Sequence, residues 1–165
     1  MSESNIIGID LGGSSVKAVL VDREGEKIDD RNCAFDPTER MSFAETIRAV
    51  VAHLESAHGE VQHIGLSAPG LAAKDGCSTA YLPNRLDGIE GLVWSDYLDR
   101  SHPIPVLNDA HAALLGEVWL GAAKGLTNVI MFTLGTGVGG AAMVDGKLLR
   151  GHTGKAGHLG HQSLN

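Results

Sequence analysis

The 165-residue chain contains 43% hydrophobic residues and 22 glycines, and it carries a formal net charge of −7 at pH 7. This composition is typical of a compact α/β protein with many tight turns and excludes a disordered chain. The negative charge has no cluster of Lys and Arg to offset it and would repel nucleic-acid phosphates, so no nucleic-acid partner is expected.

The sequence shows no signal for export or membrane insertion. Residues 1–5 lack a basic or apolar leader, and no apolar run approaches the length needed to cross a bilayer. We therefore expect a cytoplasmic protein with no membrane partner. Cys33 and Cys77 are too few for a disulfide framework and too far apart for a metal knuckle, so we interpret them as reduced structural thiols.

The first third of the chain predicts an antiparallel meander followed by a helix. Apolar residues 6–11 and 16–21 flank a glycine turn, and residues 27–35 form a third strand after the turn at 22–25. Apolar residues recur with a helical period over residues 42–56. These residues are Phe43, Ile47, Val50, Val51 and Leu54.

Two short buried strands are predicted next, at 64–68 and 106–107. A helix follows over 110–121, with Asp109 as its candidate N-cap. The resulting order is βββαβ(α)βα, with a helix allowed between the two short strands. Such an order predicts an α/β fold in which helices cover the faces of a mixed sheet.

The pattern of the first hairpin returns near the end of the chain. Residues 128–134 and 141–144 predict strands around a glycine turn at 135–140, and a tight turn at 145–146 leads into 147–149. A shift of 123 residues places Leu11 on Leu134, Gly12 on Gly135 and Ala18 on Ala141. We interpret this as an internal duplication with a shortened second copy. It predicts a domain over residues 1–121 and an incomplete one over 122–165.

The first glycine turn brings together groups that suit a magnesium phosphate site. Asp10 precedes Gly12 and Gly13, and Ser14 and Lys17 follow them. Backbone N–H groups can approach phosphate oxygens where no Cβ intervenes, and a carboxylate can hold Mg²⁺ or its waters. The alternative is an ordinary hairpin turn, for which one or two glycines are enough.

The second turn, residues 135–140, holds four glycines, which is more than a hairpin requires. Each interior glycine costs roughly 0.5–1 kcal/mol, and a ligand that approaches the backbone would explain this cost. A dinucleotide-binding turn is excluded because a strand, and not a helix, follows. Two phosphate turns on duplicated halves predict a nucleotide clamp, and plain hairpins are the alternative.

Asn108 and Asp109 lie where a buried strand ends and a helix begins. Asp109 can serve as an N-cap, which is a common use of aspartate. It can also serve as the general base that accepts the proton of an attacking hydroxyl, with Asn108 binding the substrate. The two roles are compatible, and the sequence alone does not choose between them.

These motifs together resemble the ROK family (repressor, open reading frame, kinase) of the superfamily that includes sugar kinases, actin and heat-shock chaperones. The resemblance implies a ribonuclease-H-like, actin-like ATPase fold, followed by the first β-hairpins of a second similar domain. It also implies a glucokinase-like enzyme that transfers the γ-phosphoryl group of ATP to a hexose or N-acetylhexosamine. The segments that carry it are residues 9–17, 67–70, 108–113, 121–125 and 134–140.

The resemblance assigns roles to individual residues. Asp109 would be the catalytic base, and Asp10 would hold Mg²⁺ through water. The expected contacts of the ATP phosphates are Asp10, Gly12, Gly13, Ser14, Lys17, Gly135, Thr136 and Gly137. The expected contacts of the sugar are Asn84, Asn108, Asp109, His158 and His161.

The chain departs from the family at two points. Where the family has Glu-x-Gly-His, this sequence has His158-Leu159-Gly160-His161, which replaces a pure acceptor by an imidazole that donates from one nitrogen and accepts at the other. The sequence therefore does not identify which sugar is bound. The chain is also about half as long as family members, so a structural zinc site is expected only in a longer chain, and solvated histidines are the alternative.

Two other functions are consistent with the resemblance. One is a sugar-sensing regulator without catalysis, and the other is an inactive module that binds nucleotide or sugar. The regulator is less favoured because only residues 1–5 precede the first strand and the chain is acidic. We also expect a homodimer, or association through the incomplete second domain, because its strands would be exposed.

Overall fold

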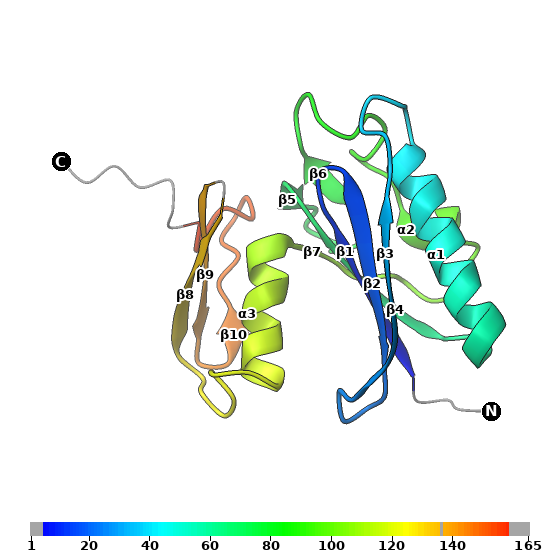
Figure 1. Cartoon of the computed structure of the whole chain (residues 1–165). Coiled ribbons are helices and arrows are strands. Elements are labelled where there is room, and N and C mark those ends of the chain that lie inside the picture. Colours follow the sequence, from blue (N-terminus) through cyan, green and yellow to red (C-terminus); the bar gives the residue numbers. More distant parts are fainter. Residues whose placement is uncertain (1–4, 136, 159–165) are drawn as a thin grey trace. The chain divides into compact units, whose positions relative to one another are not determined.

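A five-stranded mixed sheet organises the first part of the chain (Figure 1). The computed structural model describes residues 5–135 and 137–158. The sheet has the order β3-β2-β1-β4-β7, in which β1 pairs antiparallel with β2 and parallel with β4. The strands are β1 (Ile6–Leu11), β2 (Ser15–Val21), β3 (Lys27–Ala34), β4 (His63–Ala68) and β7 (Val106–Asn108). The predicted meander and mixed sheet are confirmed.

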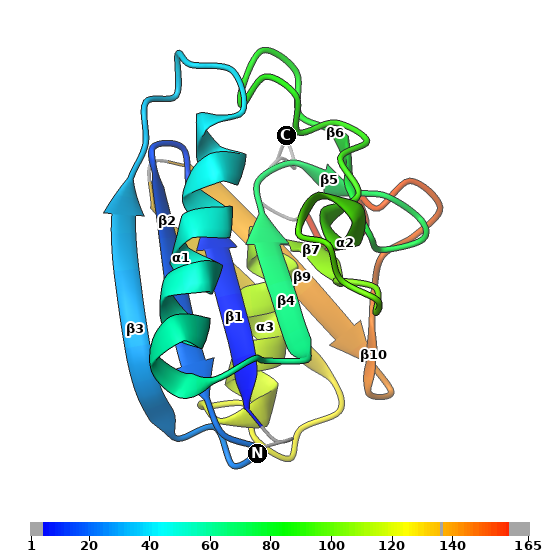
Figure 2. The same cartoon turned by 90° about the vertical axis from the view of Figure 1, so that its right-hand side faces the viewer.

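Helix α1 (Ser42–His58) covers one face of this sheet, in front of β1 and β2 in Figure 2. The five apolar residues that predicted the helix are all buried, together with Ala44. They share one core with alternate residues of β1 and β2, since successive side chains of a strand point to opposite faces. These strand residues are Ile7, Ile9, Leu11, Val16, Ala18 and Leu20. The helix ends two residues later than predicted, at His58, and the next residue, Gly59, has a φ of 89° that favours glycine.

Three short elements lie between β4 and β7, and of these the sequence allowed only a helix. Strands β5 (Leu71–Ala72) and β6 (Thr79–Tyr81) form a two-stranded antiparallel ribbon, and α2 (Trp94–Tyr97) is a single helical turn. The Trp94 side chain is fully buried and makes edge contacts with the rings of Phe43 and Tyr97. The helix allowed between the two short strands is therefore present, but it is only four residues long.

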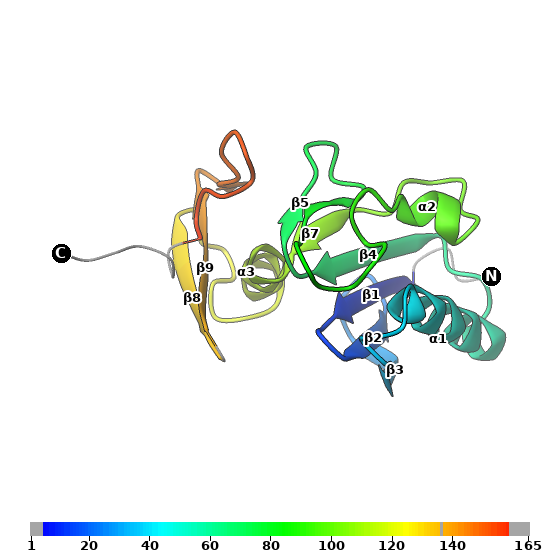
Figure 3. The same cartoon turned by 90° about the horizontal axis from the view of Figure 1, so that it is seen from above.

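The chain divides into two compact units, with the boundary between Leu107 and Asn108. In the second unit, α3 (Asp109–Trp119) packs on a three-stranded sheet of order β10-β9-β8, and Figure 3 shows the helix end-on beside β9 and β8. The strands are β8 (Val129–Leu134), β9 (Val138–Val144) and β10 (Lys147–Leu148). The predicted domains, residues 1–121 and 122–165, stay a prediction. Helix α3 belongs to the same compact unit as the hairpin that it contacts.

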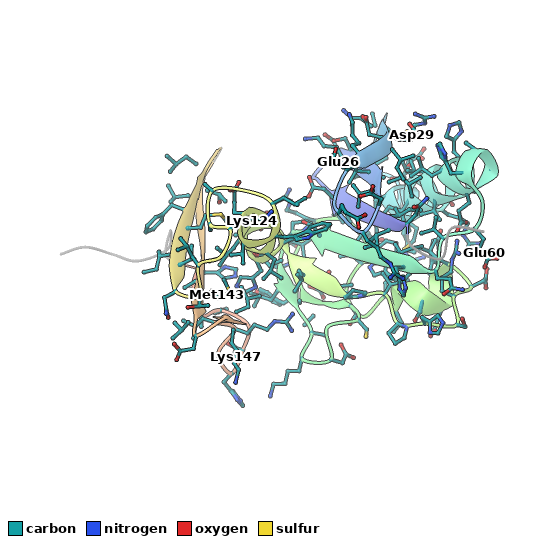
Figure 4. The ribbon with its side chains drawn as sticks, turned by 90° about the horizontal axis from the view of Figure 1, so that it is seen from below. Glu26, Asp29, Glu60, Lys124, Met143 and Lys147 are labelled. Atoms are coloured by element: carbon teal, nitrogen blue, oxygen red, sulfur yellow. The ribbon has the colours of Figure 1, made fainter. Side chains whose placement is uncertain are left out.

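A small core joins α3 to the hairpin. Ala110 and Leu114 of α3 are buried with Ala141 and Met143 of β9, and Met143 is labelled in Figure 4. The other face of the hairpin is apolar and open. Ile130, Phe132 and Leu134 of β8 are 66%, 56% and 83% exposed. The second unit thus has a core on one side of its sheet and, within the described residues, an uncovered apolar face on the other.

The two hairpins match strand for strand but differ by one residue in their turns. Leu11 pairs with Val16 in the first hairpin, whereas Leu134 pairs with Val138 in the second. The shift of 123 residues therefore holds from β1 to β8, while β9 follows β2 with a shift of 122. As a result, the partner of Asp10 is Lys17, and the partner of Thr133 is Gly139.

No helix in the part of the chain that the structure describes is both long enough and apolar enough to span a membrane.

Candidate active site

The first glycine turn joins β1 to β2 without unusual backbone angles. The Gly12 N–H donates to the Ser15 carbonyl at 2.9 Å, and the Phe35 N–H donates to the Ser14 carbonyl at 3.0 Å. Neither Gly12 nor Gly13 has a positive φ. A lack of space for a side chain explains Gly12 better than its backbone conformation does, because a Cβ there would lie 3.2 Å from the Ser15 carbonyl oxygen. The turn is therefore tight and presents bare backbone at Gly13.

A row of polar side chains crosses the sheet beside this turn. Asp10 lies opposite Lys17 on β2 and opposite Ser67 on β4, and Lys17 in turn lies opposite Asn32 on β3. The Ser67 hydroxyl donates to Asp10 Oδ1 at 3.1 Å. The side chains of Asp10 and Lys17 are exposed. The row offers a carboxylate, an ammonium and two neutral polar groups to a ligand.

The loop over residues 82–90, here named the sugar-side loop because it carries the predicted sugar contact Asn84, forms a pocket in the first unit. The pocket has a volume of about 580 Å³, which suits a small ligand, and Asn84 lines it together with Arg85 and Glu90. Asn84 adopts the left-handed conformation with a φ of 57°. The Glu90 carboxylate accepts from the Leu82 N–H at 2.6 Å and fixes the start of the loop. Sequence reasoning named Asn84 but missed Arg85, whose side chain reaches Gly13.

Asn108, and not Asp109, is the N-cap of α3. Asn108 Oδ1 accepts from the Ala110 N–H at 3.0 Å, and the Asn108 backbone is extended. Asp109 is the first helical residue, and its Oδ1 accepts from the same N–H at 2.8 Å. The expectation that Asp109 caps the helix was therefore wrong. Asn108 is 6% exposed, whereas the Asp109 side chain is exposed and its carboxylate is accessible to solvent.

The second glycine turn contains two kinds of glycine. The Gly135 N–H donates to the Gly137 carbonyl at 3.0 Å. A Cβ on Gly135 or Gly137 would meet no described atom within 4 Å, whereas a Cβ on Gly139 would collide with Thr133 Oγ1. Packing therefore explains Gly139 but not the other two. Thr136, predicted to contact phosphate, lies outside the described residues.

Two histidines lie next to each other in the second unit. The rings of His111 on α3 and His158 are 5.5 Å apart and nearly perpendicular. His111 is 3% exposed, and its Nε2 has no hydrogen-bond partner among the described residues. Burial lowers the pKa of His111, so the neutral imidazole is favoured. His161, predicted to contact the sugar, lies outside the described residues.

Binding of a metal ion places different demands on the described residues for zinc and for magnesium. They include no group of three or more His, Cys, Asp and Glu side chains placed to bind a metal ion. A protein-only zinc site is therefore absent from this part of the chain. Mg²⁺ has a different requirement, because it is commonly held by one or two carboxylates together with substrate phosphates and water. Asp10 beside the first glycine turn meets that requirement.

Comparison with known proteins identifies the family. The model of the ROK family matches residues 6–165. The chain belongs to the ROK family. This ROK chain is 35% identical to a glucokinase of Streptomyces coelicolor over 155 residues, and the match covers 94% of the chain and 48% of the relative. An N-acetylmannosamine kinase of Escherichia fergusonii is 32% identical over 158 residues, covering 94% of the chain and 53% of that relative.

A solved structure supports the same assignment. The ROK family glucokinase of Streptomyces griseus, in complex with glucose and AMPPNP, superposes with a TM-score of 0.82 at 32% identity. The match covers 98% of this ROK chain and 51% of that protein. The predicted fold class is therefore confirmed. The chain spans about half the length of the curated relatives that it matches.

Proposed function

We propose that this ROK chain supplies the catalytic base and the first phosphate-binding turn of an ATP-dependent sugar kinase. The kinase would transfer the γ-phosphoryl group of ATP to a hydroxyl of a hexose or an N-acetylhexosamine. The observation that carries the proposal is Asp109, an exposed carboxylate at the first residue of α3 whose capping role is taken by the buried Asn108. The names of the relatives, glucokinase and N-acetylmannosamine kinase, support the substrate class.

The proposed reaction needs one proton transfer. The Asp109 carboxylate accepts the proton of a sugar hydroxyl, the hydroxyl oxygen forms a bond to the γ-phosphorus, and the bond from that phosphorus to the β–γ bridging oxygen breaks to release ADP. Asn108, Asn84, His158 and His161 are proposed to bind the sugar. Phosphoryl transfer otherwise depends on positioning and on stabilisation of negative charge, so phosphate-binding groups complete the site.

The phosphate contacts are proposed for both glycine turns. Gly12, Gly13, Ser14 and Lys17 would bind phosphate from the first turn, and Gly135, Thr136 and Gly137 from the second. Support comes from Gly135 and Gly137, since a Cβ at either position would meet no described atom within 4 Å. A glycine that the fold does not require is consistent with a ligand that must reach the backbone.

Magnesium and assembly are part of the same proposal. Bound Mg²⁺ would neutralise phosphate charge, with Asp10 holding it through water and Ser67 orienting the carboxylate. A structural zinc is proposed only for a longer chain. We also propose a homodimer, or association through the second unit, that buries Ile130, Phe132 and Leu134. A monomer mass at all protein concentrations in sedimentation equilibrium would contradict this association.

The proposed activity is tested by ATP-dependent phosphorylation of a panel of hexoses, N-acetylhexosamines and N-acetylmannosamine. The assay uses the chain itself and the complete product of the reading frame that encodes it. We expect that product to phosphorylate one sugar in preference to the others. Sugar binding without turnover on any member of the panel would contradict the kinase and favour a sugar sensor.

A further inference from the structure

The Arg85 side chain lies against the first glycine turn. A Cβ built on Gly13 would be 2.9 Å from Arg85 Nη2, so the guanidinium is in contact with the bare backbone of the turn. The Arg85 side chain is exposed, and it makes no hydrogen bond or ion pair with any residue that the structure describes. An arginine usually finds a carboxylate or a carbonyl when it is held in place. Here its five N–H donors are available to an external acceptor.

The loop that carries Arg85 is held in an unfavourable conformation. Both neighbours of Arg85 are left-handed, with a φ of 57° at Asn84 and 50° at Leu86. Non-glycine residues in this region cost about 1 kcal/mol or more each, and they persist where surrounding structure imposes them. Leu86 is 4% exposed, and its carbonyl accepts from the Ile89 N–H at 3.0 Å. The buried leucine and this turn therefore hold the backbone so that Arg85 points away from the core.

Arg85 also lies between two parts of the proposed site. Its guanidinium contacts Gly13 of the phosphate turn, and its backbone follows Asn84 of the sugar-side loop. A phosphoryl group that passes from ATP to a sugar must cross the space between these parts. In that space, negative charge spreads over the equatorial oxygens of the transferring group. A planar guanidinium can donate two parallel hydrogen bonds to such oxygens.

We propose that Arg85 is a catalytic residue that binds the transferring phosphoryl group and stabilises its charge in the transition state. This inference rests on the proposed kinase function. Arg85 forms no covalent bond and exchanges no proton, so the atom balance of the transfer is unchanged. The other cation near the turn, Lys17, is on the sheet opposite Asp10, whereas Arg85 approaches from the sugar-side loop.

The test compares Arg85→Met and Arg85→Lys with Arg40→Met in the complete product of the reading frame. Arg40 is a suitable control because it is near the same loop and its Nε is 3.4 Å from Asp87 in an exposed ion pair, which contributes little to stability. We expect Arg85→Met to lower kcat by about 10²–10³-fold, and Arg85→Lys to lower it less, with the KM for sugar changed by less than about threefold. Arg40→Met should stay within about twofold of the wild type.

A structural role of Arg85 is distinguished by chemical rescue. Added guanidinium at millimolar concentration should raise the kcat of Arg85→Ala at least about tenfold and leave that of Arg40→Ala unchanged, because it can occupy the missing donor position. Turnover of Arg85→Met equal to that of Arg40→Met, or failure of guanidinium to rescue, would overturn the assignment. If the wild type phosphorylates no sugar, the kinase proposal fails. The phosphate contact of Arg85 is then tested by the affinities of wild type and Arg85→Met for ATP and AMP. A loss of ATP affinity with AMP affinity unchanged would support the phosphate contact, and equal affinities for the variant and the wild type would overturn it.

Discussion

Gly139 lies directly opposite Thr133 in the β8–β9 hairpin, and a Cβ at position 139 would collide with Thr133 Oγ1. The glycine therefore makes room for a neighbouring side chain. Its position within the second glycine turn had suggested a backbone that a ligand approaches. The structure separates this residue from Gly135 and Gly137, which have open space around them.

This relationship predicts the effect of Gly139→Ala. The added methyl group should destabilise the hairpin by about 2 kcal/mol, because overpacking a tight site displaces its neighbours. Thr133→Ala removes the colliding oxygen, so the double variant should recover most of the loss. Urea unfolding of the two single variants and the double variant gives the coupling energy. Additive effects of the two substitutions would show that the Thr133 side chain is not the reason why position 139 requires glycine.

Asp109→Asn should abolish most turnover without weakening nucleotide binding. An amide cannot accept the hydroxyl proton, so we expect kcat to fall by about 10³-fold while the affinity for ATP changes by less than about twofold. Glu45→Gln is a matched control, since Glu45 is also an exposed acid in the first turn of a helix. Steady-state kinetics and calorimetric titration of ATP measure the two quantities. Undiminished turnover in Asp109→Asn would exclude this residue as the base.

The ion pair between Glu55 and Arg100 should make stability depend on pH in the acid range. Arg100 donates to both Glu55 oxygens, at 2.9 and 2.7 Å, and the Val61 N–H donates to Glu55 Oε1 at 3.0 Å. Burial alone would raise the pKa of Glu55, but these hydrogen bonds outweigh it and lower the pKa below its ordinary value of 4.5. The stabilisation is therefore complete above pH 4.5 and is lost as the pH falls through the lower folded pKa.

Glu55→Gln tests this assignment. The variant should lose about 1 kcal/mol at pH 7, because the partly buried hydrogen bonds to Arg100 lose the charge of their acceptor. It should also show a smaller decrease in stability below pH 4.5 than the wild type. Thermal unfolding at pH 7 and at several values below pH 4.5 measures both effects. Parallel stability curves for the two proteins would contradict the lowered pKa of Glu55.

His111 should contribute a second pH dependence at higher pH. Burial lowers the pKa of His111 below its ordinary value of 6.5, so the unfolded chain takes up a proton more readily than the folded one. Stability from this group is complete above pH 6.5 and decreases as the pH falls toward the folded pKa. His111→Asn removes the titrating group. The difference in unfolding free energy between variant and wild type should therefore change between pH 7.5 and 5.5, and a constant difference would contradict the assignment.

Periodicity and turn chemistry predicted the larger elements correctly. The apolar residues of α1 recur every three or four positions, and burial alternates along β1, β2 and β8, which are bounded by clear turn signals. The ribbon β5–β6 was not predicted, and the helix α2 was allowed without bounds, because two to four residues hold too little pattern. The position of α2 depends on the burial of Trp94, whose ring contact with Phe43 of α1 is tertiary.

The candidate site was only partly predictable for a related reason. Asp10, Asn84 and Asp109 were found because each stands at the end of an element or in a recognisable motif. Arg85 was missed, since its contact with Gly13 joins residues 72 positions apart and depends on the path of an irregular loop. Asp109 was also wrongly predicted as the N-cap in place of Asn108, because both residue types are common N-caps.

The one-residue difference between the hairpin turns makes the two copies chemically unequal. Where the first copy places an ammonium group opposite Asp10, the second places Gly139 opposite Thr133. At these positions one hairpin is therefore charged and the other is neutral. Thr133→Asp together with Gly139→Lys would give the second hairpin the charges that the first has at these two positions, but not the length of its turn.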